Sequence, residues 1–96
     1  MKQLKQLLSS VIVEEIVGNE NIEITAVISD SRRAIPGALF VAVRGVNVDG
    51  HSFIPSLHEK GVVAIVCEEL PLRLEPTVTY VRVANTSVAL GFIASE

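Results

Sequence analysis

Two uninterrupted runs of six apolar residues, at 38–43 and 62–67, constrain the fold of this chain more than any other feature. An apolar run without polar alternation is typical of a β-strand that is buried on both faces. Between the runs, residues 52–60 are predicted to form a short helix with Pro55 in its first turn and Gly61 at its end. Because strand, helix and strand together form a βαβ unit, the two strands are expected to be parallel.

Further strands are expected on both sides of this unit. The 15 Val and 9 Ile residues make up a quarter of the chain, and β-branched side chains favour a pleated sheet. Apolar residues recur at every second position in 22–28 and 78–83, which is typical of strands with one well-buried face. The stretch 11–17 fits either a helix or a strand. We predict a single small α/β domain with a mixed, mostly parallel sheet of about four to five strands and short flanking helices.

Two more helices are expected near the ends of the chain. Leucines at helical spacing predict one over 3–10. A second helix is expected to begin near Val88, capped by Asn85, Thr86 or Ser87. A helix this short is marginal by itself, so it is either a frayed end or the start of a helix that leads to another domain. We favour the second interpretation, with a domain at 1–86 and the start of the connecting helix at 87–96.

Charge and cysteine content exclude several classes of protein. The net charge of −3 does not fit a nucleic-acid-binding domain, which would carry a surplus of basic residues. The single cysteine, Cys67, cannot form an internal disulfide. No apolar run approaches the ~18 residues of a membrane-spanning helix, so we expect a cytoplasmic protein without a membrane span. The spacing of His51, His58 and Cys67 matches no zinc site, so no metal ligand is predicted.

The sequence predicts a ligand site but no catalytic residue. It contains neither Gly-x-x-x-x-Gly-Lys-Ser/Thr nor Gly-x-Gly-x-x-Gly, the two glycine-rich loops that hold phosphates. Polar residues follow a predicted strand at 29–33, and a glycine-containing loop at 45–50 follows the next one. Ligands of α/β folds commonly bind beyond the ends of such strands. Together the two loops could line one crevice that accepts a flat heterocycle and an anion.

The residues of these loops also allow a purely structural interpretation. Ser29 and Ser31 offer hydroxyls, and Arg32 or Arg33 offers a guanidinium that suits a phosphate or carboxylate. However, Asp30 could simply order the turn, and Arg32 could pair with Asp30 or with Asp49. The loop at 45–50 could likewise be only a tight connection between a strand and a helix. Pattern alone does not decide between these two interpretations.

Several motifs in and around these loops are distinctive when taken together: Ser29-Asp30-Ser31-Arg32, Pro36-Gly37-Ala38-Leu39-Phe40-Val41-Ala42, Gly45, Asp49-Gly50-His51-Ser52-Phe53-Ile54, Gly61 and Ala64-Ile65-Val66. In these motifs the sequence resembles the amino-terminal domain of the Mur ligases, the ATP-dependent amide ligases of bacterial peptidoglycan synthesis. The resemblance covers about 22–96 and is strongest to the MurE type, with a MurF-type ligase as the alternative. The stretches 66–71 and 81–94 favour MurE.

The resemblance implies a division of labour in a larger enzyme. The first domain of the family holds the UDP end of UDP-N-acetylmuramoyl-L-alanyl-D-glutamate, and the central domain, which is missing here, carries ATP and magnesium. This chain is then a substrate-binding part that is inactive alone and needs no cofactor of its own. A free-standing α/β binding module is the remaining alternative. A reading frame that continues into a phosphate loop would favour the ligase.

The resemblance also implies which residues contact the substrate. The expected UDP contacts fall on Ser29 and Ser31 in the first loop, and on Val46, Asn47 and Val48 in the second. Contacts at 46–48 are expected to involve the backbone. The supporting residues that match the family signature are Asp30, Arg32 and Asp49.

Overall fold

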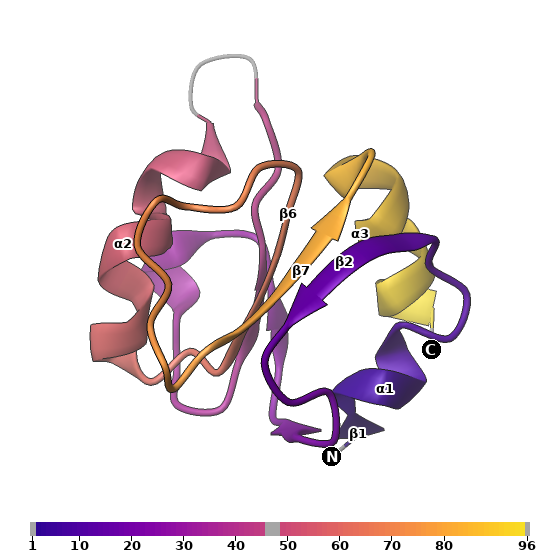
Figure 1. The fold of residues 1–96 in the computed structure, drawn as a ribbon, viewed down its shortest axis with the longest axis horizontal. Coiled ribbons are helices and arrows are strands. Elements are labelled where there is room, and N and C mark those ends of the chain that lie inside the picture. Colours follow the sequence, from indigo (N-terminus) through magenta and orange to yellow (C-terminus); the bar gives the residue numbers. More distant parts are fainter. Residues whose placement is uncertain (1, 46–48, 96) are drawn as a thin grey trace.

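The predicted strand–helix–strand unit forms the middle of a five-stranded sheet (Figure 1). The computed structural model describes residues 2–45 and 49–95. Strand β5 (Leu39–Val41) pairs in parallel with β6 (Ala64–Cys67), from Leu39 opposite Ala64 to Val41 opposite Val66. The prediction that the two apolar runs form neighbouring parallel strands is therefore confirmed.

The order of the strands is β2-β7-β6-β5-β4. The added strands are β4 (Val27–Ile28), β7 (Thr79–Val83) and β2 (Val13–Val17). Strands β4, β5, β6 and β7 are parallel, and only β2 is antiparallel to its neighbour β7. This confirms a mixed, mostly parallel sheet and resolves the ambiguous stretch 11–17 largely into a strand.

The alternating stretch 22–28 does not form one continuous strand as predicted. It divides into β3 (Glu23–Ile24), which pairs with β1 (Lys2–Gln3), and β4, which pairs with β5. The break occurs at Thr25, whose backbone N–H donates to Gly37 O at 3.0 Å and whose hydroxyl donates to Pro36 O at 2.8 Å. These bonds tie Thr25 to the turn before β5, so the ladder is interrupted there. Gly37 in this turn has φ +82°, a conformation that glycine adopts without steric cost.

Helical segments occur at the three predicted places, with shifted ends. The first, α1 (Leu4–Leu7), is shorter than the predicted 3–10. The 3₁₀ segment η2 (Gly50–Phe53), α2 (Ile54–Leu57) and η3 (His58–Lys60) follow one another without a gap, and Gly61 ends them with φ +84°. The last, α3 (Thr86–Ser95), follows Asn85, which accepts a hydrogen bond from Val88 N at 3.0 Å. No helix in the described ranges is long and apolar enough to cross a membrane.

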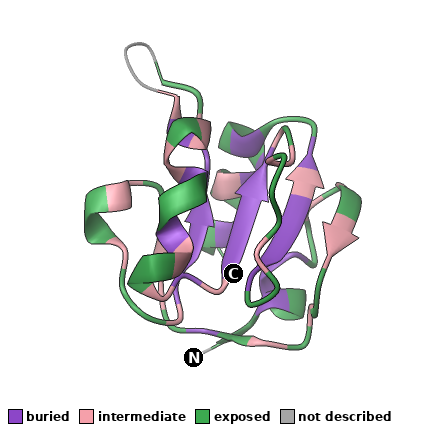
Figure 2. Cartoon of the chain, turned by 60° about the vertical axis from the view of Figure 1, so that its left-hand side comes forward, coloured by how far each residue is buried: buried purple, intermediate pink, exposed green. Residues whose placement is uncertain are grey.

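The sheet is covered on both faces by different helices. Helices α1 and α3 lie over one face, and α2 lies over the other (Figure 1). Side chains along each strand alternate between these layers, so Leu39 packs in the first cluster and Phe40 in the second. Buried residues concentrate on the central strands, and exposed ones on the loops and outer helix faces (Figure 2). Cys67 is fully buried, and burial raises its pKa to about 11, as expected of an inert core thiol.

Candidate functional site

A groove of about 660 Å³ lies where β4 and β5 end, and it brings the two predicted loops together. This is the edge of a parallel sheet at which ligands commonly bind. Val46, Asn47 and Val48 lie outside the described residues. We call this cavity the loop groove, and its lining residues are Ser29, Asp30, Ser31, Arg32, Val43, Gly45, Gly50, Phe53 and Leu90.

The first wall of the loop groove is a turn that Asp30 orders. The Asp30 carboxylate caps η1 (Ser31–Arg33) by accepting a hydrogen bond from Arg32 N at 2.9 Å. It also accepts from Arg32 Nε at 3.1 Å and Nη2 at 2.8 Å. These side-chain and backbone donors lower the pKa of Asp30 to about 2. Of the two partners predicted for Arg32, the structure thus selects Asp30.

The serine hydroxyls of this turn remain available to a ligand. Within residues 2–45 and 49–95, the hydroxyls of Ser29 and Ser31 have no hydrogen-bond partner. Ser29 is exposed and Ser31 is half-buried. Lys60, at the end of η3, donates to Ser31 O at 3.3 Å, so its ammonium group lies next to the same turn. The turn therefore offers two hydroxyls without a partner in the described ranges, with the side chains of Arg32, paired with Asp30, and Lys60 beside them.

The second wall is set by a close approach of backbone segments at Gly50. Gly50 N donates to Val43 O at 2.9 Å. A Cβ atom at position 50 would lie 2.9 Å from Val43 N and 3.1 Å from Ala42 Cα, so only glycine fits without a shift. Gly50 therefore packs the start of η2 closely against the end of β5, as expected of a tight connection between a strand and a helix.

Asp49 and Arg44 belong to a larger polar network that sequence analysis missed. Asp49 caps η2 by accepting from His51 N at 2.9 Å, which is the first cause of its lowered pKa. Arg44 Nε lies 3.0 Å from Glu68 Oε1, and Arg44 Nη2 lies 3.1 Å from Glu69 Oε1. The acidic pair that directly follows the apolar run at 62–67 was the available signal, because parallel neighbours β5 and β6 end at the same edge.

Phe53 and Leu90 were also missed as lining residues of the loop groove. They come from η2 and α3, and both are half-buried. Their apolar side chains face the cavity together with Val43, beside the hydroxyls and cations of the first turn. The loop groove therefore combines an apolar part with hydrogen-bond donors and positive charge, which suits a flat ring that carries an anionic group.

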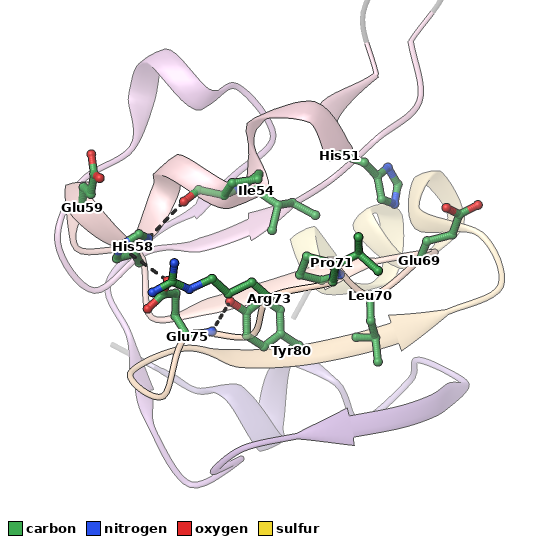
Figure 3. Close-up of a pocket in the computed structure, with 12 residues that line it drawn as sticks. His51, Ile54, His58, Glu59, Glu69, Leu70, Pro71, Arg73, Glu75 and Tyr80 are labelled. Atoms are coloured by element: carbon green, nitrogen blue, oxygen red, sulfur yellow. Dashed lines mark hydrogen bonds and ion pairs between the residues drawn. The ribbon is translucent and has the colours of Figure 1, made fainter.

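A larger cavity of about 840 Å³ lies between α2 and the segment that follows β6, and it has different chemistry (Figure 3). Three glutamates, Glu59, Glu69 and Glu75, line it beside a single arginine, Arg73, so the excess of carboxylates disfavours an anion. Its polar groups bond to one another: Tyr80 Oη accepts from Glu75 N at 3.0 Å, and His58 Nε2 lies 3.9 Å from Glu75 Oε1. Within the described residues, no group of three His, Cys, Asp or Glu side chains is placed to hold a metal ion.

Comparison with protein families gives a match over most of the chain. The matching family is described as "Mur ligase family, catalytic domain", and the match covers residues 23–96. The UDP-N-acetylmuramoyl-L-alanyl-D-glutamate--2,6-diaminopimelate ligase of Bacteroides fragilis is 47% identical over 93 residues, 97% of this chain. The ligase of the same name from Cytophaga hutchinsonii is 44% identical over 96 residues. The chain spans 19% and 20% of the length of these two relatives.

Solved structures with a similar fold are ligases as well. A crystal structure of MurF from Acinetobacter baumannii matches 97% of this chain with a TM-score of 0.73 and 25% sequence identity. The chain spans 20% of that protein. MurF ligase from Thermotoga maritima in complex with ADP matches 72% of this chain with a TM-score of 0.62 and 28% identity. The α/β fold found here is thus a part of larger ligases.

Proposed function

Because this chain belongs to the Mur ligase family, we propose that it holds the UDP end of UDP-N-acetylmuramoyl-L-alanyl-D-glutamate for a MurE-type ligase. The names of the relatives supply the substrate and favour diaminopimelate as the added amino acid. Identity of 47% to a ligase of this name, against 25% to a MurF of similar fold, favours MurE over MurF. The whole enzyme is then an ATP-dependent acid–amino-acid ligase of cytoplasmic peptidoglycan synthesis.

The single observation that carries the proposal is the loop groove with two serine hydroxyls that have no partner among the described residues. Ser29 and Ser31 bind the uridine diphosphate there, and the cations of Arg32 and Lys60 stand beside the diphosphate. Phe53 and Leu90 provide apolar contacts for a flat ring. Asp30 supports the site by ordering the first turn. The contacts assigned to Val46, Asn47 and Val48 remain part of this proposal, as does the supporting role of Asp49.

Catalysis belongs to other parts of the enzyme. The sequence contains no phosphate loop, and the described residues offer no cluster of metal ligands. ATP, which activates the carboxylate of the D-glutamate, and magnesium would therefore be held by the central domain of the same protein. We assign 1–86 to substrate binding and 87–96 to the start of the helix toward that domain, with Leu90 of this helix adding an apolar contact to the loop groove. The proposed partners are the UDP-linked substrate and the other domains, without nucleic acid.

The overall charge of the chain opposes the binding of a dianion. The net charge is −3, so the mean field repels UDP. Physiological salt screens such fields over ~8 Å, and direct contacts act at shorter range. Attraction therefore depends on the cations and hydroxyls of the first turn, and the affinity of this chain alone should be weak because other domains add contacts.

Titration of the chain with UDP in a calorimeter tests the proposal. We expect weak binding that Ser31→Ala reduces by ~1–3 kcal/mol, because the variant removes a hydroxyl from a partly buried hydrogen bond. Ser95→Ala is the matched control, since Ser95 is exposed at the end of α3 and bonds only within that helix. Absence of heat at millimolar UDP, with a folded circular dichroism spectrum, would contradict the proposed function.

A further inference from the structure

A network of hydrogen bonds ties both stems of the loop at 44–50 to the end of β6 and to the start of α3. We propose that Glu68 and His51 are positioning residues for the nucleotide, which act by holding the walls of the loop groove in place. They do not line the loop groove themselves. They act through their neighbours Gly45 and Gly50, which line the loop groove. This inference rests on the proposed function, because it assigns a role within that site.

The two oxygens of the Glu68 carboxylate bind two different segments, the first stem of the loop and the start of α3. Oε1 lies 3.0 Å from Arg44 Nε, at the first stem of the loop. Oε2 accepts from Thr86 N at 3.0 Å and from Thr86 Oγ1 at 3.1 Å. Thr86 is fully buried and begins α3, the helix that carries Leu90 into the loop groove. Glu68 therefore links Arg44, at the first stem of the loop, to the start of α3.

His51 holds the second stem of the loop, and the hydrogen bonds of its two ring nitrogens select one tautomer. Its Nε2 accepts a hydrogen bond from Glu68 N at 2.9 Å. A neutral imidazole with an accepting Nε2 carries its proton on Nδ1, which here donates to Asp49 Oδ1 at 2.7 Å. The side chain is only 14% exposed. The backbone N–H of Glu68 thus holds His51, which in turn holds Asp49, and the carboxylate of Glu68 holds Arg44.

The same network removes Arg44 from the set of residues that could bind phosphate. Its guanidinium faces the carboxylates of Glu68, Glu69 and Asp49, at 3.0, 3.1 and 3.7 Å. Three carboxylates around one cation leave no net positive charge for an anionic ligand. Arg44 therefore fastens the first stem of the loop, and the positive charge for the diphosphate comes from the opposite wall, where Lys60 stands beside the Asp30–Arg32 pair.

UDP titrations of matched variants test the positioning role. His51→Leu removes the acceptor for Glu68 N and should weaken UDP binding about tenfold, the effect of one lost hydrogen bond in a partly buried site. His51→Gln retains an acceptor and should restore affinity to within about threefold of the unmodified chain. Glu68→Gln, which loses the charge facing Arg44, should weaken binding by about three- to tenfold. Glu15→Gln, in the ion pair with Arg82 at 3.4 Å, is the control that should leave affinity unchanged.

Two readouts separate the possible failures. If the chain binds UDP and Ser31→Ala weakens binding, but the changes at His51 and Glu68 do not, the positioning role is wrong and the proposed function stands. If the chain does not bind UDP, both the positioning role and the proposed function are wrong. Nitrogen-15 NMR of the His51 ring needs no variant: a proton on Nδ1 supports the network, and a proton on Nε2 overturns it. This measurement tests the hydrogen bond between His51 and Glu68 on which the positioning role depends, even if His51→Leu fails to fold.

Discussion

The turns that follow β4 and β5 share one local design but have different surroundings. Asp30 accepts from the backbone N–H of Arg32 and Asp49 from that of His51, both at 2.9 Å, and each caps a 3₁₀ helix. The side chain of Arg32, the partner of Asp30 in the first turn, is 88% exposed, whereas the side chain of His51, the partner of Asp49 in the second turn, is 14% exposed. The local motif therefore sets the shape of a turn, and burial determines how firmly it is held.

The two turns also differ in how far along the chain their hydrogen-bond partners lie. Among the described residues, the carboxylate of Asp30 bonds only to Arg32, two residues away, and the turn is also reached by the side chain of Lys60, which donates to Ser31 O at 3.3 Å from an exposed position. The second turn is linked to Glu68, 17 residues beyond His51, and Glu68 is linked to Thr86, 18 residues further on. Contacts of this kind cross from β5 to β6 and α3. We expect the first turn to be able to adjust to a ligand, and the second to act as a fixed wall.

The largest expected effect comes from breaking the fixed wall at its closest contact. Gly50→Ala places a Cβ 2.9 Å from Val43 N and 3.0 Å from Val43 O, so the backbone must shift. Overpacking of this kind should lower the free energy of unfolding by ~1–3 kcal/mol, measured by urea denaturation. Gly91→Ala is the control, because a Cβ there meets nothing within 4 Å inside α3. It should stabilise the chain by ~0.5–1 kcal/mol. Equal midpoints for the two variants would contradict the close packing at Gly50.

Features that depend on neighbouring residues could be predicted from the sequence. The apolar runs at 38–43 and 62–67 predicted two parallel strands, since burial on both faces leaves no polar alternation. The break at Thr25 was missed because it depends on bonds to Pro36 and Gly37, eleven and twelve residues away. Alternation alone could not reveal that 22–28 contributes to two different sheets.

The same division applies to the candidate site. The polar turn at 29–33 was predicted because Asp30 and Arg32 are close in sequence and their types suit a capped turn. Phe53 and Leu90 were missed because helix packing alone brings them to the loop groove. The role of Glu68 was missed for the same reason: its partners Arg44 and Thr86 meet it only in the folded sheet.

The network around the second turn should contribute measurably to stability, and its contribution should depend on pH. Glu68→Ala leaves the N–H and hydroxyl of buried Thr86 without this acceptor, so we expect a loss of ~1–2 kcal/mol at pH 7. The Thr86 backbone N–H is the first cause of the lowered pKa of Glu68. A carboxyl group whose pKa is lowered by folding stabilises the folded state at pH values above its ordinary pKa of 4.5. This stabilisation is lost as the pH falls through the pKa of the folded state.

Urea denaturation across this pH range measures that dependence. The stability difference between the unmodified chain and Glu68→Ala should narrow as the pH falls below 4.5. Glu14→Ala, which removes a carboxylate 2.7 Å from Arg82 on the opposite part of the sheet, provides the comparison for an exposed ion pair. A stability difference for Glu68→Ala that stays constant with pH would mean that the charge of this carboxylate does not support the second turn.

The smallest effect on stability is expected at the first turn. Arg32→Ala removes a side chain that is 88% exposed, and an ion pair in water contributes little to folding. The Asp30 carboxyl should nevertheless respond, because Arg32 donates the bonds that lower its pKa from 3.8 to about 2. In the variant, the carbon-13 shift of Asp30 should titrate closer to 3.8, although the remaining backbone bond still favours the charged form. An unchanged titration, or a loss of stability as large as that of Glu68→Ala, would show that burial does not separate the two turns.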